Sequence, residues 1–268
     1  MTNEYQIFPD IRLVCGADGC RSDADETEIS VCIGGCCEYS TEHEYRYLTA
    51  GTCHIGRGDC RTVYSRNYRG ITLLISPRES SSLGGLFDVQ ELCTCIGADE
   101  HLIFRADEAV QRLAEELSAV RGSSRTAMLR IRSVELLMLL GERKTARCEH
   151  GNTIRRIGSF ICENISEHCT IPQLAELFGI APYMLKAEFS RYYGSSVYAY
   201  TKMRKMFRAA ELLRGTDMKI IDIAEEVGYC NASKFASAFR DVVGRAPRDY
   251  RTEHKLTASS AKCAVKAS

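Results

Sequence analysis

The stretch from Thr170 to Tyr250 contains the same supersecondary pattern twice. The first copy, Ile171–Gly194, reads IPQLAELFGIAPYMLKAEFSRYYG, and the second, Ile220–Gly244, reads IIDIAEEVGYCNASKFASAFRDVVG. Each copy predicts a short amphipathic helix that ends near a glycine, a tight turn, and a second helix closed by another glycine. Two helices set at a steep angle by a short turn form the unit whose second helix enters the major groove of DNA. The duplication therefore predicts two DNA-reading units joined by one helical stretch.

This segment resembles the DNA-binding domain of the AraC/XylS family of bacterial transcription regulators, which carries two helix-turn-helix units on one linker helix. The resemblance covers residues 153–251, and the stretch Gly244–Arg251 at its end is its most family-specific part. The residues that carry the match are Leu174, Ala175, Glu176, Gly179 and Phe189 in the first unit, and Ile223, Ala224, Val227, Gly228, Tyr229, Phe235, Phe239, Gly244, Pro247 and Tyr250 in the second.

The resemblance implies an α+β chain with two working parts. We expect residues 1–143 to form an effector-binding and dimerisation domain, a small cupin-like β-barrel with two helices. Residues 144–152 would be a linker, residues 153–254 the double helix-turn-helix domain, and residues 255–268 a flexible tail. The implied function is that of a sequence-specific transcription regulator, an activator that responds to a small-molecule effector. Its expected partners are double-stranded promoter DNA, RNA polymerase and a second copy of the chain, with no cofactor and no enzymatic activity.

Length and charge agree with this organisation. A chain of 268 residues is long enough to bury two modest cores. Its 35 basic and 35 acidic residues balance overall, but residues 151–268 hold 18 Lys+Arg and 12 Asp+Glu, which gives +6. The preceding residues hold 35 − 18 = 17 against 35 − 12 = 23, which gives −6. A basic half attracts phosphate, so the asymmetry favours nucleic-acid binding by the C-terminal half.

Two features of the chain predict a cytoplasmic location. The N-terminal residues lack the basic and apolar regions of a signal peptide. The longest apolar run, Leu136–Leu140, is far shorter than the ~20 residues that a membrane span needs.

The first hundred residues have the pattern of short strands. Apolar residues alternate over residues 29–33, and the glycines Gly34 and Gly35 that follow predict a two-residue hairpin turn. Further strand-like runs cover residues 45–48, 53–55, 61–64 and 71–75. Many short strands with frequent turns predict a small barrel or sandwich.

The period then changes to that of helices. A helix is expected after Asp107, which suits an N-cap, and a second helix covers residues 125–140. The second helix is more apolar than one packing face requires. We interpret its extra apolar surface, including Ile131 and Met138, as a dimer contact; the alternative is a helix buried against its own barrel.

The candidate DNA contacts lie on the predicted second helix of each unit and on the connecting helix. In the first unit, Leu185 and Phe189 should face the core, and Lys186 could donate to guanine while Tyr183 could touch a thymine methyl group or a phosphate. In the second unit the small side chains leave open whether that unit specifies sequence or binds backbone. The full set is Tyr183, Lys186, Ala187, Ser190, Arg191, Lys202, Arg204, Asn231 (also a predicted N-cap), Ser233, Lys234 and Ser237.

The effector is not defined by the sequence. A sugar, an aromatic acid, a heme-like ligand and a soft metal all stay open. The aromatic residues of the strand region provide the candidate lining, which is Tyr39, Tyr45, Tyr47, His54, Tyr64 and Tyr68.

Fourteen cysteines raise an alternative function, sensing of redox state or of a soft metal by thiols. Nine of them precede residue 96, and the closest pairs are Cys36/Cys37 and Cys93/Cys95. The other interpretation is that these are small buried apolar residues on strands. Paired CxxC units are absent from the sequence, so no structural zinc site is predicted.

Two enzymatic alternatives are disfavoured. A catalytic cupin needs a clustered His/Glu metal set, and Glu42, His43, Glu44 and His54 do not have that spacing. A DNA-repair alkyl acceptor would carry proline-flanked cysteine pairs, and the sequence has none.

Overall fold

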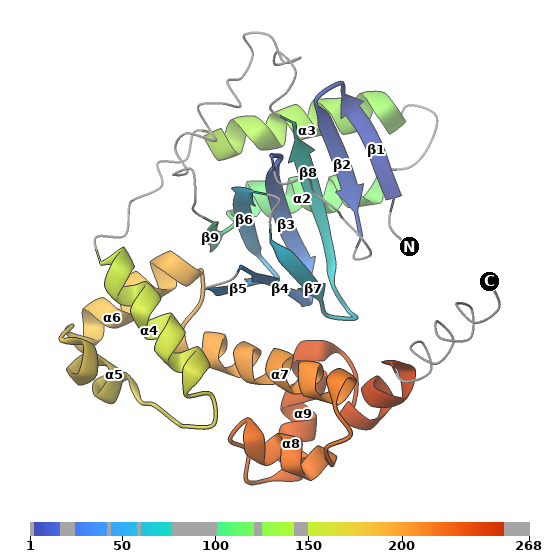
Figure 1. The fold of residues 1–268 in the computed structure, drawn as a ribbon. Coiled ribbons are helices and arrows are strands. Elements are labelled where there is room, and N and C mark those ends of the chain that lie inside the picture. Colours follow the sequence, from blue (N-terminus) through green and yellow to red (C-terminus); the bar gives the residue numbers. More distant parts are fainter. Residues whose placement is uncertain are drawn as a thin grey trace.

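A computed structural model describes residues 3–16, 25–41, 44–57, 60–76, 101–120, 125–141 and 150–254 (Figure 1). Several sequence-based predictions fall outside these ranges: most of the linker, the C-terminal tail, and the cysteine pair Cys93/Cys95. The described residues form a sheet-rich N-terminal half and a helical C-terminal half (Figure 1).

The strands of the N-terminal half are arranged in two antiparallel sheets. The larger sheet has the order β1-β2-β8-β3-β6-β9, and the smaller has the order β5-β4-β7. The strand bounds are Asn3–Phe8 (β1), Ile11–Cys15 (β2), Thr27–Gly34 (β3), Cys36–Ser40 (β4), Tyr45–Thr49 (β5), Thr52–Arg57 (β6), Arg61–Tyr64 (β7), Arg69–Ile75 (β8) and Leu102–Arg105 (β9).

Two expectations about this region are corrected. Within the described residues the sheets do not close into a barrel, because β1 and β9 are the outer strands of the larger sheet. The cupin-like barrel is therefore not confirmed. The predicted hairpin at Gly34-Gly35 is wrong: Gly35 does turn the chain, but β3 pairs with β6 and β8, whereas β4 pairs with β5 and β7. The turn carries the chain from one sheet to the other.

Two helices cover one face of the larger sheet (Figure 1). They are α2 (Glu108–Ala119) and α3 (Arg125–Gly141). The predicted N-cap is confirmed, because the Asp107 carboxylate accepts a hydrogen bond of 2.9 Å from the Val110 amide. Alternate residues of β3, β6 and β8 pack under these helices, as the two-residue period of a strand requires.

The intervening residues of the same strands point to the opposite face, where the smaller sheet lies. Ser30, His54 and Thr72 are buried on this side, next to Tyr39 of β4. The smaller sheet in turn contacts the helical half through its other face. The molecule is therefore layered, with helices α2 and α3, the larger sheet, the smaller sheet, and then the helices of the C-terminal half (Figure 1).

The helical half contains α4 (Gly151–Glu163), α5 (Ile171–Phe178), α6 (Pro182–Tyr193), α7 (Val197–Gly215), α8 (Ile220–Glu226) and α9 (Ala232–Val243). A further helical segment covers residues 247–254. The long connecting helix α7 joins the pair α5–α6 to the pair α8–α9, as the duplicated sequence predicts. Its N-terminus is capped by Ser196, whose hydroxyl accepts a hydrogen bond of 3.2 Å from the Ala199 amide.

One continuous core holds these helices together. Leu185 and Phe189 of α6 and Phe235 and Phe239 of α9 are completely buried, as their spacing predicts. The Phe189 ring makes an edge-to-face contact with Tyr200 of α7 at a centroid distance of 5.4 Å. These anchors fix both second helices against α7. None of the described helices has the length and apolar character needed to cross a membrane.

Candidate nucleic-acid interface

Helix α6 presents a set of exposed residues on the side away from its anchors. It begins at Pro182, which suits the first turn of a helix because proline lacks the amide hydrogen that would be unpaired there. Tyr183 is 74% exposed, and Lys186, Ala187 and Ser190 are exposed on the same side. The structure therefore brings these four predicted residues together on one outward face.

Arg191 follows on the next turn of α6. Its guanidinium forms an ion pair with Glu188 of the same helix, and 45% of the Arg191 side chain remains exposed. The Glu188 side chain is only 10% exposed, so the pair is half-buried, and Arg191 would have to leave it to reach a phosphate.

Helix α9 presents an equivalent but smaller face. The Asn231 side chain accepts a hydrogen bond of 2.9 Å from the Lys234 amide, which confirms its predicted role as N-cap. Ser233, Lys234 and Ser237 are exposed on the side opposite the buried phenylalanines. Lys234 is the only cation among these three, so this face has less capacity for base contacts than that of α6.

The glycines that end the first helix of each unit adopt the same backbone conformation in different surroundings. Gly179 has φ 63° and Gly228 has φ 75°, a left-handed region that other residues rarely adopt. A Cβ atom at Gly179 would meet nothing within 4 Å. At Gly228 it would lie 2.1 Å from the carbonyl oxygen of Ser166 in the segment after α4.

The predicted position of Arg204 is wrong. The sequence places Arg204 with Lys202 among the DNA contacts of the connecting helix, but Arg204 and its neighbour Lys205 are buried. The Arg204 guanidinium lies 3.5 Å from the Glu38 carboxylate of β4 and 3.7 Å from the centroid of the Tyr45 ring. The N-terminal half covers this side of α7, which a helical pattern read in isolation could not reveal.

The Lys202 side chain is partly exposed. Its ammonium group lies 3.3 Å from the Asp241 carboxylate of α9, and 30% of the side chain is exposed. It stays a candidate phosphate contact.

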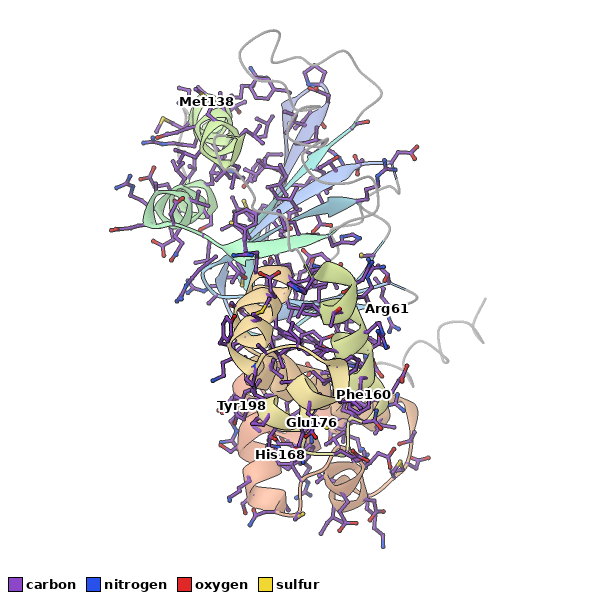
Figure 2. All side chains as sticks on the ribbon, turned by 90° about the vertical axis from the view of Figure 1, so that its left-hand side faces the viewer. Arg61, Met138, Phe160, His168, Glu176 and Tyr198 are labelled. Atoms are coloured by element: carbon purple, nitrogen blue, oxygen red, sulfur yellow. The ribbon has the colours of Figure 1, made fainter. Side chains whose placement is uncertain are left out.

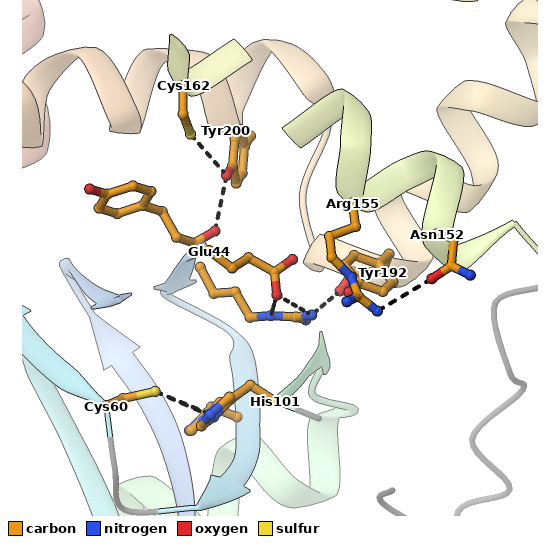
Figure 3. A network of polar contacts seen from close by, with 11 residues as sticks. Glu44, Cys60, His101, Asn152, Arg155, Cys162, Tyr192 and Tyr200 are labelled. Carbon is orange, nitrogen blue, oxygen red and sulfur yellow. Dashed lines mark hydrogen bonds and ion pairs between the residues drawn. The ribbon is translucent and has the colours of Figure 1, made fainter. Parts of the chain in front are cut away.

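Some of the contacts that join the two halves involve the C-terminal ends of α6 or α9. Arg46 of β5 donates to the Tyr192 carbonyl oxygen at 3.0 Å, with its guanidinium 4.4 Å from the Tyr192 ring centroid. The Cys36 thiol donates to the Val242 carbonyl oxygen at 3.3 Å, and the Arg66 amide donates to the Val243 carbonyl oxygen at 3.1 Å. Figure 3 shows part of this region, where Glu44 lies close to Tyr192. Most of the candidate DNA contacts lie nearer the N-terminal ends of both second helices.

The six candidate effector-lining residues do not share one space. Tyr45 and Tyr47 of β5 face the helical half, and the Tyr47 ring stacks on Phe207 of α7 at 5.6 Å. This corrects the expectation that all six line the interior of the N-terminal domain.

The other four lie on the side of the smaller sheet that faces the larger one. The Tyr39 ring stacks on His54 at a centroid distance of 4.1 Å, and the Tyr64 and Tyr68 rings lie 4.7 Å apart. The Tyr68 hydroxyl is buried without a hydrogen-bond partner in the structure. A buried polar atom of this kind is costly unless a partner completes it.

A buried polar chain adjoins this aromatic group, and the sequence analysis missed it. The Cys60 sulfur lies 3.1 Å from His101 Nε2 (Figure 3). His101 Nδ1 lies 3.0 Å from His54 Nε2. His54 Nδ1 lies 3.8 Å from the Glu28 carboxylate. Glu28 also accepts hydrogen bonds from the Tyr39 hydroxyl at 2.6 Å and from Ser30 at 2.7 Å. No motif in the sequence links residues 28, 54, 60 and 101, because only the pairing of distant strands brings them together.

The buried cysteines of β4 are poor candidates for a reactive thiol. Burial raises the pKa of Cys36 to about 11, and burial likewise raises the pKa of Cys37 well above its usual range. The thiolate is the reactive form, so burial suppresses the reactivity of this pair. In the part of the chain that the structure describes, no group of three or more His, Cys, Asp or Glu residues could hold a metal ion.

Comparison with known proteins identifies the helical half. A family described as a helix-turn-helix domain matches residues 174–253. The regulatory protein SoxS of Salmonella typhimurium is 31% identical over 107 residues, which cover 40% of this chain and 98% of SoxS. The chain belongs to the AraC/XylS family. Its relatives named here are regulatory proteins and a transcriptional activator.

Other AraC/XylS relatives match over different lengths. The F1 operon positive regulatory protein of Yersinia pestis is 33% identical over 100 residues, 37% of this chain and 33% of that protein. The virulence regulon transcriptional activator VirF of Yersinia enterocolitica is 29% identical over 159 residues, 56% of this chain and 59% of VirF. The chain thus spans about a third of one relative and somewhat more than half of the other.

Solved structures show weaker likeness. The C-terminal domain of AraT from Geobacillus stearothermophilus is 30% identical, with a TM-score of 0.38 over 40% of this chain and 88% of that one. ToxT from Vibrio cholerae is 12% identical, with a TM-score of 0.37 over 94% of this chain and 96% of ToxT. At these TM-scores the likeness adds nothing to the family assignment.

Proposed function

We propose that this AraC/XylS-family regulator reads promoter DNA with the outward faces of α6 and α9 and activates transcription with RNA polymerase. The observation that carries the proposal is the pair of exposed faces held on one helix, α7, by completely buried phenylalanines. Two such faces on a rigid connector would address successive turns of the major groove, about 34 Å apart. The charge of +6 over residues 151–268 supports attraction to phosphate.

The two faces have different roles in this proposal. Helix α6 supplies base recognition through Lys186 and Tyr183, with Ala187 and Ser190 beside them. Helix α9 binds mainly the DNA backbone through Ser233, Lys234 and Ser237, because small hydroxyl side chains offer few paired contacts to base edges. Lys202 and Arg191 add phosphate contacts.

The effector site of the proposal lies between the two sheets, at Tyr39, His54, Tyr64 and Tyr68. Its support is the unpartnered hydroxyl of Tyr68 among aromatic rings, which suits a small ligand with an apolar body and one polar group. A ligand there would touch β4, and β4 carries Glu38, which pairs with Arg204 of α7 on its other face. Effector binding would therefore act on the DNA-binding half through β4.

The alternative of thiol sensing by Cys36 and Cys37 has less support. Both thiols are buried with raised pKa values, and Cys36 already donates to a carbonyl oxygen of α9.

Replacing Lys186 with alanine tests the proposed base contact. We expect Lys186→Ala to weaken binding to the cognate promoter site by about 1–3 kcal/mol and to reduce discrimination at one or two base positions. The measurement is a fluorescence anisotropy titration of the full chain on the cognate site and on single-base variants, at several salt concentrations.

The matched control for this experiment is Lys234→Ala, which removes an exposed lysine from α9. It should weaken binding about equally on all sequences and lower the slope of log K against log salt. The proposed division of roles is contradicted if Lys186→Ala only changes the salt slope and preserves the base preference.

We also propose that residues 1–143 form a homodimer through the outward side of α3. That side carries Met128, Ile131 and Met138, which are 43%, 61% and 47% exposed. Figure 2 labels Met138 on this helix. The opposite side, with Leu136, Leu137 and Leu140, is buried against the sheet and α2. The helix therefore has both an inner apolar face and an outer one. Exposed apolar stripes of this kind mark interaction sites more often than chance.

Charge on the outer stripe should prevent assembly. We expect the double variant Ile131→Glu, Met138→Glu to be a folded monomer, because two carboxylates cannot be desolvated in an apolar contact. Sedimentation velocity measures the mass, and circular dichroism checks the fold. A control with Thr126→Glu, at an exposed position outside the stripe, should stay dimeric. An unchanged mass of the stripe variant would exclude this face.

A further inference from the structure

The chain of contacts from Cys60 to Glu28 shares His54 with the proposed effector site but is not explained by it. Four titratable side chains from β3, β6, the start of β7 and the start of β9 meet in one line: the Cys60 sulfur, both ring nitrogens of His101, both ring nitrogens of His54, and the Glu28 carboxylate. His54 is fully buried, His101 is 9% exposed, and Cys60 is half-buried at the outer end of the line. The DNA-binding half does not use any of these side chains.

The backbone is shaped to admit the two imidazole rings. Gly56 of β6 lies directly beside them, and a Cβ atom at this position would fall 2.2 Å from His101 Nδ1 and 2.8 Å from His54 Nε2. Only glycine leaves room for the ring-to-ring contact, in which the rings stack with 9° between their planes. The contact between the two rings therefore depends on the glycine at position 56 of β6.

The acid end of the line stays ionised although it is buried. Burial by itself would raise the pKa of Glu28, but His54, followed by the Tyr39 and Ser30 hydroxyls, outweighs burial and leaves that pKa lowered. His54 Nδ1 has no hydrogen-bond partner and faces this carboxylate at an ion-pair distance. A proton on His54 Nδ1 is thus favoured, which leaves His54 Nε2 to accept from His101 Nδ1–H. His101 Nε2 is then the acceptor that faces the Cys60 thiol.

We propose that Cys60 is a reactive thiol activated by His101 and that it is the site at which this protein reacts with hydroperoxides. An imidazole in contact with a thiol takes its proton and stabilises the thiolate. His54 and Glu28 are positioning residues, since they set the tautomer of His101 and stabilise its charged form. The arrangement has the order nucleophile, base, orienting group. Among the described residues it is a hydrogen-bonded line, and they include no group of three or more ligands that could hold a metal ion.

The reaction balances without any further component. His101 Nε2 takes the thiol proton, and the Cys60 thiolate attacks the distal oxygen of a hydroperoxide. The S–O bond forms, the O–O bond breaks, and the alkoxide or hydroxide leaving group takes the proton from His101. The sulfur is oxidised by two electrons to a sulfenic acid, and the hydroperoxide is reduced to an alcohol or water. The half-buried position of Cys60 suits a small oxidant of this kind.

The inference does not depend on DNA binding, so the two proposals are tested separately. Purified full-length protein is treated with hydrogen peroxide and a sulfenic-acid trap, and each cysteine is followed by peptide mass spectrometry. Cys230 is exposed and serves as the reference thiol in the same molecule. At pH 6 we expect Cys60 to react at least about tenfold faster than Cys230, because an ordinary thiol with a pKa near ~8.5 is almost entirely protonated there.

The role of His101 is tested in two ways. In the unsubstituted protein, the rate of alkylation by iodoacetamide is measured as a function of pH. The pH at which this rate is half-maximal should be lower for Cys60 than for Cys230. In His101→Gln, the Cys60 rate should fall to that of Cys230, and the DNA affinity should stay unchanged. The matched control is His150→Gln, a substitution outside the N-terminal sheets, which should leave the Cys60 rate as it was.

Three results would overturn the proposal. They are equal oxidation rates for Cys60 and Cys230 in the folded, unsubstituted protein; rapid alkylation of Cys60 without sulfenic acid; and a Cys60 rate that survives in folded His101→Gln. The first two results are obtained with the unsubstituted chain. The proposal can therefore be contradicted even if the His101→Gln variant does not fold. A loss of DNA binding in the untreated protein would count against the proposed function and not against the reactive thiol.

Discussion

Gly228→Ala should destabilise the DNA-binding half far more than Gly179→Ala, although the two glycines end equivalent helices. Both have positive φ, so alanine at either position costs about 1–2 kcal/mol for the left-handed conformation. At Gly228 the added Cβ would also lie 2.1 Å from the Ser166 carbonyl oxygen, which is backbone and cannot rotate away. Overpacking of this kind adds about 1–3 kcal/mol, so we expect a total loss of roughly 2–5 kcal/mol at Gly228.

The measurement is urea unfolding of the full chain, followed by far-ultraviolet circular dichroism. Gly179→Ala is the matched control, because a Cβ atom there meets nothing within 4 Å. Equal shifts of the unfolding midpoint in the two variants would show that the segment after α4 does not press on Gly228. Promoter binding should follow stability, since Gly228 sets the angle between α8 and α9 and makes no proposed DNA contact.

Arg204→Ala is expected to destabilise the contact between the two halves by about 3–5 kcal/mol, the cost of leaving one member of a buried ion pair without its partner. The side chains of Arg204 and Glu38 are 6% and 3% exposed, and the Tyr47 hydroxyl donates to the same carboxylate at 2.8 Å. Lys202→Ala on the same helix is the control. The exposed pair of Lys202 with Asp241 should contribute at most about 1 kcal/mol.

The loss of folding free energy caused by Arg204→Ala (the deficit) should depend on pH. Burial raises the pKa of Glu38 from its ordinary value of 4.5 to about 7, although Arg204 lowers it in part. A carboxyl group whose pKa is raised in the folded state stabilises that state at low pH, and the stabilisation is lost as the pH rises from 4.5 to 7. Without Arg204 the pKa of Glu38 should rise further, so the deficit should be small near about pH 5 and largest near about pH 8.

This expectation is checked by measuring the unfolding midpoint between about pH 5 and about pH 8. The unsubstituted chain, Arg204→Ala and Lys202→Ala are compared. A deficit that is the same at both ends of the range would mean that Arg204 acts through its contact with the Tyr45 ring and not through the charge of Glu38. A selective loss of promoter affinity, with stability intact, would instead restore Arg204 as a DNA contact.

The sequence alone determined the helical half of this protein in some detail. The period of its apolar residues identified the buried anchors Leu185 and Phe189, and the local signal Asn231 identified a helix start. Asp107 did the same for α2 in the N-terminal half. These predictions succeed because a helix is built from contacts three and four residues apart, so its inner face, its outer face and its caps can all be read from a short window.

Tertiary structure decided the features that depend on distant partners. Strand pairing placed β3 and β4 in different sheets, against the local hairpin signal, and brought His101 between Cys60 and His54. The packing of the two halves buried Arg204, which the helical period alone had placed outside. In each case the deciding contact joins residues far apart in the chain, and the free energy of such a contact depends on which surfaces meet. The sequence of a single strand or helix does not contain that information.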